Sequence, residues 1–476
     1  MSAHVKLQPR IIIHGGAGNI KRENMSLEEY QEYRQALIGI VTKTHTYMTT
    51  PKTPSSKTSP FSHLSSHQYP SALESAVHAV TQLEDNALFN SGHGAVFTRD
   101  GYNELEASVM VSRGYAKRGV GVTGLRHVKN PILLAKAMLE HGNQDLGGEP
   151  EGAEPNRRLN VPSAQGHTLI HGPAAGQLAV QYGLETVDPA YFFTQRRWDE
   201  HIRGLEKEKT GKGVATWCPE SYFPQGTCGA VALDENGVVC VATSTGGITN
   251  KLTGRIGDTP VVGAGFWAEE WTERGDPSGV RDDSSFSGAV VQLTDALKGL
   301  LADCLPTPSL YRPVAPLSER RKQVYVTRST AVSGTGNGDS FMRLAAARSV
   351  GAMAQWAGIS AASAVEAIAG RGGQLQQSAG HRWGIAGEGE GGMIGIESVV
   401  AKNELGEVLY TRSDIVHDHN CAGMFRAWID DDGQPRMQIW HDEGDAAFEK
   451  SVALSCGEGK AAFSRSSDDE CKTLLD

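Results

Sequence analysis

The chain has 476 residues, enough for about three domains or for one large α/β unit that carries insertions. Its 45 basic and 55 acidic residues leave a net charge of −10 without any basic block, which argues against nucleic acid as a partner. No run approaches the roughly 18 apolar residues of a membrane-spanning helix, and the first residues are too polar for a signal-peptide core. Seven scattered cysteines without a Cys-x-x-Cys pair fit a reducing, cytoplasmic location.

The apolar pattern predicts strands and helices that come in runs rather than in strict β-α-β alternation. Such runs favour an α+β fold with antiparallel sheet over a doubly wound parallel sheet. Ser71, followed three residues later by Glu74, has the spacing of a capping box at a helix start. We expect helices over 28–43, 71–83, 131–140, 173–182 and 341–370, and strands over 10–14, 95–97, 105–111, 228–233, 238–243 and within 393–430.

Polar segments interrupt this pattern. Residues 43–71 are rich in Ser, Thr, Pro and His, and residues 142–166 in Gly, Glu, Asn and Pro, so we expect two disordered insertions. Residues 201–225 are charged and then rich in Gly and Pro, which indicates an exposed linker. The tail from about residue 457 is polar and is expected to fray.

The tetrapeptide 226–229, Gly-Thr-Cys-Gly, lies where this linker meets the strongest strand signal in the chain. A threonine hydroxyl is a poor nucleophile without a base, but a threonine at a new chain start can use its own α-amine as the base. A lead-in that can be cut, followed by a rigid strand, suits such a role for Thr227. The alternative is an ordinary strand threonine. The turn at 234–237 predicts a hairpin that brings Thr245 close to Thr227.

Two glycine-rich loops carry further candidate residues. Arg255 and Asp258 share one loop, where their charges suit the carboxylate and ammonium of a free amino acid. The alternative is a structural ion pair between them. Residues 333–339 alternate glycine with small polar residues, so their backbone N–H groups can hold an oxyanion. The alternative there is a plain turn, and the loop lacks the Lys-Ser/Thr ending of a nucleotide-binding loop.

Three other motifs suggest chemistry that their surroundings do not support. Residues 263–268 loosely match a dinucleotide fingerprint, but a tryptophan and a polar stretch follow where an amphipathic helix is needed. The run 417–419, His-Asp-His, with Cys421 has no zinc spacing, and we expect exposed loop histidines there. His93 is interpreted as a structural loop histidine.

Taken together, these motifs resemble the plant-type asparaginase / isoaspartyl aminopeptidase family of N-terminal nucleophile hydrolases. Their order and spacing match the family across roughly 11–430, apart from the insertions. The matching stretches are IIIHGGAGNI at 11–20, LFNSGHGAVFTRDG at 88–101, VKNPILLAKAML at 128–139, ETVDPAYFFTQRRW at 185–198, GTCGAVALDENG at 226–237 and STGGITNKLTGRIGDTPVVGAG at 244–265.

The resemblance implies a four-layer αββα sandwich of the α+β class and self-cleavage between Gly226 and Thr227. The mature enzyme would contain an α chain, residues 1–226, and a β chain, residues 227–476, which together form one catalytic domain. Two such heterodimers usually associate in this family. The substrate would be a small amino acid or dipeptide, and no metal or organic cofactor would take part in the chemistry.

Motif matching also assigns roles to single residues. Thr227 would be the nucleophile and Thr245 its hydrogen-bond partner. Arg255 would hold the substrate α-carboxylate and Asp258 the α-amine. The remaining implied positions are Thr335 and Gly336 in the oxyanion hole, Gly338 lining the site, and Asn90 near the nucleophile's amine. The family loop before Asn90 often binds sodium through backbone carbonyls.

The departures from the family pattern concern the substrate. Asn337 matches the related glycosylasparaginases, whereas plant-type members tend to have histidine there, and residues 244–247 match the plant type. The usual Met-Asp-Gly is missing, because Met110 is followed by Val-Ser. We expect hydrolysis of the side-chain amide of asparagine or of β-aspartyl peptides. The alternatives are a glycosylasparaginase, a non-processing binding pseudoenzyme and, more distantly, a dinucleotide-dependent oxidoreductase.

Overall fold

The computed structural model describes most of the chain and divides it into two compact units. The described residues are 7–52, 68–115, 118–145, 163–211, 213–217, 226–275 and 324–441. The smaller unit comprises Met1–Val5, Thr272–Thr327 and Val399–Thr411, and the larger comprises Lys6–Trp271, Arg328–Ser398 and Arg412–Asp476. All the candidate site residues belong to the larger unit.

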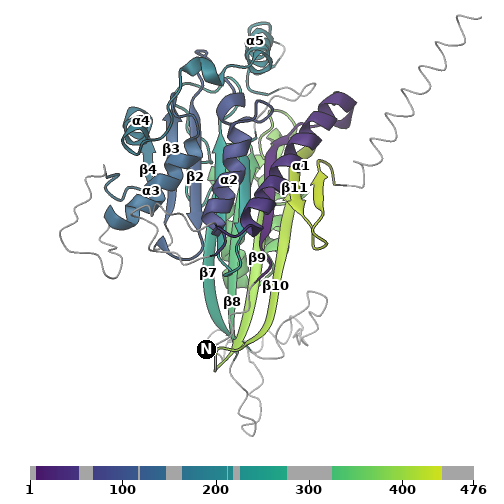
Figure 1. Cartoon of the computed structure of the whole chain (residues 1–476). Helices are drawn as coiled ribbons and strands as arrows, with labels where there is room; N and C mark the ends of the chain where they lie inside the picture. Colours follow the sequence, from purple (N-terminus) through teal and green to yellow (C-terminus); the bar gives the residue numbers. More distant parts are fainter. Residues whose placement is uncertain are drawn as a thin grey trace, which may run out of the picture. The chain divides into compact units, whose positions relative to one another are not determined.

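Two β-sheets form the framework of the fold (Figure 1). The eight-stranded sheet has the order β12-β11-β1-β5-β6-β2-β3-β4, and its neighbours are antiparallel except for β3 and β4. Its strands are β1 Arg10–Gly18, β2 Leu105–Val111, β3 Gly119–Leu125, β4 Leu169–His171, β5 Cys228–Leu233, β6 Val239–Thr245, β11 Gly423–Ile429 and β12 Pro435–Gln438. The four-stranded sheet, in the order β10-β9-β8-β7, contains β7 Phe266–Gly275, β8 Val324–Gly336, β9 Gly391–Asn403 and β10 Val408–His419.

Helices cover the eight-stranded sheet on one face, where α1, α2 and α3 lie across the strands in Figure 1. These are α1 Leu27–Thr49, α2 Ala72–Glu84 and α3 Pro131–Asp145. Helix α4 Gly172–Gln181 packs against β3, and α5 Gln195–Lys209 follows it in the chain. A second group of helices packs together later in the chain and comprises α7 Gly338–Leu344, α8 Ala346–Ala352, α9 Ala361–Ala369 and α10 Gln374–Ala379. Among the described helices, none combines the length and apolar character needed to cross a membrane.

Buried apolar side chains form three clusters, which follow from the alternation of side chains along each strand. Cys228 and Ala230 of β5 join the cluster beneath α1 to α3, whereas Val231 joins a second cluster with residues of the other sheet. The members of the second cluster from the other sheet are Phe266, Ala268, Ala331, Ile394 and Ile396. A third cluster combines Val332 and Met393 with the apolar faces of α7 to α10.

Several sequence predictions are confirmed. Ser71 and Glu74 form the capping box of α2, with the Ser71 hydroxyl accepting from the Glu74 amide and the Glu74 carboxylate accepting from the Ser71 amide. The β5–β6 hairpin exists in the expected register, with Cys228 opposite Ser244. Asp234 closes its turn by accepting hydrogen bonds from the backbone amides of Asn236 and Val238. The prevalence of antiparallel pairing agrees with the expected α+β class.

Other expectations need correction. Residues 95–97 are not a strand, and α1 continues to Thr49, so the first expected insertion begins inside a helix. Similarly, α3 continues to Asp145, and α5 occupies the first part of the expected linker up to Lys209. The remaining parts of these segments at 53–67, 146–162 and 218–225, and the tail from 457, lie outside the described residues.

Candidate active site

Polar side chains gather on the surface that the eight-stranded sheet turns toward the four-stranded sheet. On β5 this surface carries Val231, and two and four residues earlier the same alternation gives Gly229 and Thr227. Ser333 and Thr335 continue the alternation of Ala331 on β8. The polar side chains buried on this surface are His14, Ser108, Thr227, Thr243 and Thr245, and the buried Ser333 and Thr335 belong to β8 of the four-stranded sheet.

The residue before Thr227 occupies a position that has room only for glycine. A Cβ on residue 226 would come within 2.5 Å of Gly16 Cα and 2.6 Å of the Ala17 nitrogen, so any side chain would collide with the backbone of β1. The same position lies 2.9 Å from the Thr335 hydroxyl oxygen. Thr227, only 4% exposed, follows immediately and leads into β5.

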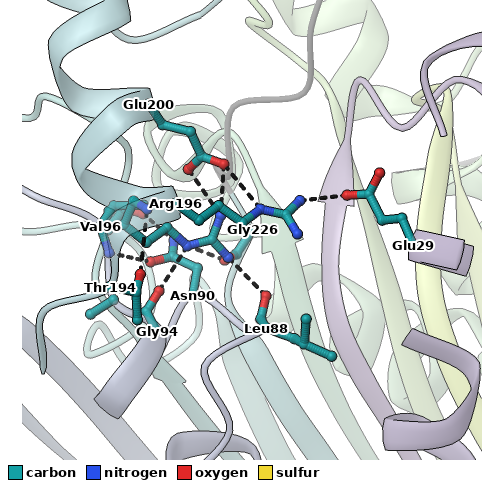
Figure 2. A network of polar contacts seen from close by, with 12 residues as sticks. Glu29, Leu88, Asn90, Gly94, Val96, Thr194, Arg196, Glu200 and Gly226 are labelled. Atoms are coloured by element: carbon teal, nitrogen blue, oxygen red, sulfur yellow. Dashed lines mark hydrogen bonds and ion pairs between the residues drawn. The ribbon is translucent and has the colours of Figure 1, made fainter. Parts of the chain in front are cut away.

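Asn90 is bonded to the carbonyl oxygen of this peptide bond (Figure 2). Its Nδ2 donates to Gly226 O at 3.2 Å and to Gly247 O at 2.6 Å, while its Oδ1 accepts from the Val96 amide at 3.0 Å. Three hydrogen bonds therefore fix the amide in one orientation. The resemblance placed Asn90 near the nucleophile's amine, and in the uncut chain it contacts the carbonyl on the other side of the same bond.

The hydroxyl of Thr227 is bonded to Thr259, not to Thr245. The two hydroxyl oxygens, Thr227 Oγ1 and Thr259 Oγ1, are 2.8 Å apart. The hairpin register does bring Thr245 opposite the start of β5, as predicted. The Thr245 hydroxyl, however, accepts a hydrogen bond from the Gly247 amide at 2.9 Å in the turn that follows β6. The expected bond between Thr227 and Thr245 is therefore absent from the uncut chain.

Arg255 and Asp258 come together at Gly338. A Cβ on residue 338 would lie 2.5 Å from Asp258 Oδ1 and 3.1 Å from Arg255 Nη2, so glycine is required where the two side chains approach. Arg255 forms its ion pair with Asp339, at 3.2 Å, and not with Asp258. Asp258 is buried, and its Oδ2 has no hydrogen-bond partner among the described residues. Burial raises the pKa of Asp258 to about 7, whereas the charge of Arg255 lowers it.

The end of β8 supplies the two residues assigned to the oxyanion hole. The Thr335 hydroxyl is fully buried and has no partner among the described residues. Gly336 has φ = 140°, and a Cβ there would come within 2.4 Å of Glu390 O, so this position also needs glycine. The next residue, Asn337, caps α7, because its Oδ1 accepts from the amide and the hydroxyl of Ser340.

The chain is similar in sequence to several known proteins. A family model described as asparaginase matches residues 63–154 and 158–273. The chain is 28% identical to the isoaspartyl peptidase of Escherichia coli strain K12 over 435 residues, which cover 91% of this chain and 97% of that protein. It is 31% identical over 268 residues to the plant-type L-asparaginase of Thermococcus kodakarensis, covering 55% of this chain and 70% of that protein. The chain belongs to the asparaginase family.

A further relative supports the same grouping. The isoaspartyl peptidase/L-asparaginase of Bos taurus is 30% identical over 263 residues, covering 55% of this chain and 68% of that protein. Members of this asparaginase family are hydrolases of the N-terminal nucleophile type, and the chain is therefore a hydrolase. The resemblance found in the sequence motifs is thus confirmed.

The loop around Asn90 is held by a buried arginine that the motifs did not single out. Arg197 Nη2 donates to Leu88 O at 2.8 Å and Arg197 Nε to Gly94 O at 2.9 Å, and Glu200 pairs with the same guanidinium. Because Arg197 is 1% exposed and its charge is paired, it acts as an internal clamp on the loop.

Two other carbonyls of this loop fit the sodium that the family often binds. The oxygens of Phe89 and Ala87 lie 2.2 and 2.5 Å from where a Cβ of Gly94 would be, so they converge on a space left open by glycine. Backbone carbonyl oxygens are suitable ligands for hard cations. The carbonyls of Leu88 and Gly94 accept from Arg197, and Phe89 O accepts from the Ser91 amide at 2.9 Å, so at Phe89 an ion would use the second lone pair of the carbonyl oxygen.

His14 is a buried histidine close to the backbone of Thr227. Its Nε2 lies 2.7 Å from Ser333 Oγ, which joins β1 of one sheet to β8 of the other. A Cβ on Gly229 would come within 2.4 Å of both groups, so the ring and the hydroxyl lie directly over that glycine. Burial lowers the pKa of His14 to about 3, partly offset by a hydrogen bond to the Thr227 backbone, so the imidazole is neutral at pH 7.

The structure shows in which elements the motifs that suggested other chemistry lie. Residues 263–268 lead into strand β7, not into the helix that a dinucleotide fingerprint needs. His417 and His419 lie on β10, and His419 is fully buried, so the expectation of exposed loop histidines is wrong. The rings of His419 and His441 stack in parallel, 3.9 Å apart, and Arg426 approaches the His419 ring. The potential ligand atoms of Asp418, His419 and His441 lie within 4.8 Å of one another, while His441 Nε2 is 2.7 Å from the His419 carbonyl oxygen.

Sequence reasoning therefore missed three groups at the site. Thr259, His14 and Arg197 all lie inside quoted family motifs, but nothing in their spacing distinguishes them from neighbouring residues. Thr259 follows Asp258 directly, and Arg197 is one of two adjacent arginines. Only the tertiary contacts select them.

Proposed function

We propose that the chain is an autoprocessing threonine hydrolase that cleaves the side-chain amide of L-asparagine, of β-aspartyl (isoaspartyl) peptides, or of both, and releases aspartate. The related proteins named isoaspartyl peptidase and plant-type L-asparaginase support this reaction class. One observation carries the proposal: a buried threonine hydroxyl follows a glycine whose carbonyl oxygen accepts a hydrogen bond from Asn90.

Self-cleavage is the first step. Thr227 Oγ attacks the carbonyl carbon of Gly226, and Asn90 Nδ2 stabilises the negative charge that develops on the Gly226 oxygen. The C–N bond then breaks as the Thr227 nitrogen takes up a proton, which leaves an ester between Gly226 and Thr227 Oγ. Water hydrolyses this ester to a Gly226 carboxylate and a free Thr227. The products are the α chain, residues 1–226, and the β chain, residues 227–476.

Turnover uses the same hydroxyl with a new base. The free α-amine of Thr227 takes the Oγ proton as Oγ attacks the side-chain amide of the substrate. Thr335 and Gly336 stabilise the oxyanion, and the amine product leaves with the proton. Water then hydrolyses the β-aspartyl ester, with the α-amine again as base. The Thr335 hydroxyl, which has no partner among the described residues, lies beside Gly226 in the uncut chain, so departure of Gly226 would open the space next to that hydroxyl to the substrate.

Arg255 and Asp258 orient the substrate in this proposal. The guanidinium holds the α-carboxylate and the carboxylate of Asp258 holds the α-ammonium, so that the side-chain carbonyl reaches Thr227. Gly338 leaves room for both side chains, and Thr245 lines the nucleophile's strand from the opposite position in the hairpin. Since Arg255 Nη2 is paired with Asp339 in the structure, the substrate carboxylate would compete with Asp339 for this group.

The finer architecture is also proposed. The three apolar clusters support a four-layer αββα sandwich, in which helices cover the outer face of each sheet. Family membership supports an assembly of two αβ heterodimers. The free, buried Cys228, Cys240 and Cys421 are consistent with a reducing cytoplasm. The chemistry requires no cofactor, and a structural sodium ion would be held by the Ala87 and Phe89 carbonyls.

Parallel assays test the function. Purified, processed enzyme should release aspartate from asparagine or from a β-aspartyl dipeptide, and Thr227→Ala should release none. Turnover of glycosylated asparagine alone would favour the glycosylasparaginase alternative. Asn337 gives that alternative no support of its own, because its side chain is engaged as the cap of α7. A chain that stays uncut and inactive on all three substrates would point to a binding pseudoenzyme.

A further inference from the structure

We propose that Thr259 is a further catalytic residue, whose hydroxyl holds the reacting oxygen of Thr227 during self-cleavage and turnover. This inference rests on the proposed function, since it takes Thr227 as the nucleophile. The two hydroxyl oxygens are 2.8 Å apart, and both residues are buried, at 4% and 1% exposure. Among the described residues, each of these hydroxyls hydrogen-bonds only to the other.

The position of Thr259 is fixed through its backbone. Its carbonyl oxygen accepts a hydrogen bond from Ser108 Oγ at 2.6 Å, and the same Ser108 hydroxyl is bonded to Thr243. Ser108 lies on β2 and Thr243 on β6, where the two are paired across the sheet. The loop that carries Thr259 is therefore attached to the sheet directly beside the strand that pairs with β5.

The same loop carries the proposed ammonium-binding residue. The carbonyl oxygen of Asp258 accepts from the amides of Val261 at 3.0 Å and Gly265 at 3.2 Å, which closes the segment on itself. One rigid loop thus presents Asp258 to the substrate and Thr259 to the nucleophile. Asp258 and Thr259 are joined by a single peptide unit. The loop therefore links the position of the substrate to the position of the Thr227 hydroxyl.

The hydrogen bond matters because a threonine hydroxyl can rotate among staggered χ1 positions. With Thr259 in place, the orientation of Thr227 Oγ is restricted in a buried site where the described residues offer the hydroxyl no other hydrogen-bond partner. Without it, the hydroxyl is free to leave that orientation, and the reacting geometry becomes less populated. Removing one hydrogen bond of ordinary net strength should slow the reaction by about threefold to tenfold.

The decisive comparison uses Thr259→Val, which keeps the shape of the side chain and removes the hydroxyl. Thr259→Ser keeps the hydroxyl and removes a methyl group. Thr330→Val is the matched control, because Thr330 is a fully buried threonine whose hydroxyl has no hydrogen-bond partner among the described residues. Thr259→Cys, with a weakly hydrogen-bonding thiol of similar size, replaces the valine variant if that protein does not fold.

The self-cleavage time course is measured by intact mass, and kcat, KM and Tm are then measured on processed enzyme with a β-aspartyl dipeptide. Thr259→Val should slow cleavage and lower kcat by about threefold to tenfold with KM unchanged, and Thr259→Ser should recover most of both rates. Thr330→Val should behave as wild type. The inference would be overturned by any of three results. These are wild-type rates in Thr259→Val, no recovery of the rates in Thr259→Ser, or a loss in Thr330→Val equal to that in Thr259→Val. A wild-type chain that is not cut at Thr227 would instead overturn the proposed function.

Discussion

The side-chain amide of Asn90 donates a hydrogen bond to the carbonyl oxygen of Gly226, at a distance of 3.2 Å. In the proposed cleavage this oxygen becomes the oxyanion, so the amide should stabilise the transition state more than the ground state. Asn90→Asp keeps an acceptor for the Val96 amide but removes both donors. We expect self-cleavage about 100- to 1,000-fold slower, the range found when one oxyanion-hole donor is lost.

A time course by denaturing gel measures this effect, and Tm provides the control for folding. Asn90 also bonds to Gly247, so some loss of stability is expected in any substitution. A variant that melts at a lower temperature but is cut at the wild-type rate would show that Asn90 only supports the loop.

The ion pair between Arg255 and Asp339 predicts competition with the substrate. Asp339 is 62% exposed in its side chain, so the pair contributes little to stability. Asp339→Asn should free the guanidinium and lower KM severalfold without changing kcat. Arg255→Ala should raise KM and lower kcat/KM by about 10- to 150-fold, as expected for a charge-assisted hydrogen bond. An unchanged KM in both variants would mean that Arg255 does not contact the substrate carboxylate.

The buried carboxyl of Asp258 predicts a pH dependence of substrate binding. Burial raises its pKa to about 7, so below that pH the group is mostly protonated and cannot pair with an ammonium. The affinity for aspartate should therefore fall by up to about tenfold per pH unit below 7 and level off above it. The affinity for aspartate is measured by calorimetry, because a pH profile of kcat would also contain the protonation of the catalytic α-amine. Affinity independent of pH between 5 and 8 would contradict the assignment.

Glu84, at the end of α2, predicts a pH dependence of stability. It is fully buried, and burial raises its pKa from 4.5 to about 8, although hydrogen bonds from Ser244, the Ile132 amide and Asn130 lower it. The unfolded chain releases this proton above about pH 4.5, whereas the folded chain keeps it until about pH 8. The free energy of unfolding should therefore decrease as pH rises through this window, on the order of 1 kcal/mol per pH unit from this group.

Glu84→Gln removes that dependence, so its stability relative to the parent should increase between pH 5 and 8. Denaturant unfolding in the uncut Thr227→Ala background measures this on a single chain. Glu74→Gln is the matched control, because the pKa of Glu74 is lowered. Partial burial raises this pKa, but the hydrogen bonds and charge from Lys52 and Ser71 lower it by more. The stability difference of Glu74→Gln should stay constant over the same range. Parallel pH profiles for Glu84→Gln and its parent would contradict the prediction.

The sequence predicts that Thr227 leads into a buried strand, because the local apolar pattern marks the start of that strand clearly. It also predicts the hairpin that brings Thr245 opposite Thr227, since turn chemistry determines the register. It does not predict the bond to Thr259, because that contact depends on how the loop after β6 attaches to Ser108. Local spacing contains no information about such a contact.

Among the helices and strands that the sequence does not predict, α5 and β8 share a physical reason. Helix α5 lacks an apolar face, since its buried residues include the paired charges of Arg197 and Glu200. The charged residues 201–225, which include its second half, therefore indicate a linker when only the sequence is considered. The second half of β8 was expected to be a loop because glycines alternate there with small polar residues. In the structure these residues are strand positions whose small side chains leave room for the site. Apolar periodicity does not identify a helix or a strand whose buried side chains are polar.

Intact-mass analysis of the purified protein tests the central claim most directly. If Thr227 is an N-terminal nucleophile, the mass spectrum must contain two chains, one ending at Gly226 and the other beginning at Thr227, and Thr227→Ala must give one uncut chain without activity. A wild-type chain that remains whole after prolonged incubation while hydrolysing a β-aspartyl dipeptide would contradict the account. So would cleavage of Thr227→Ala at the same bond.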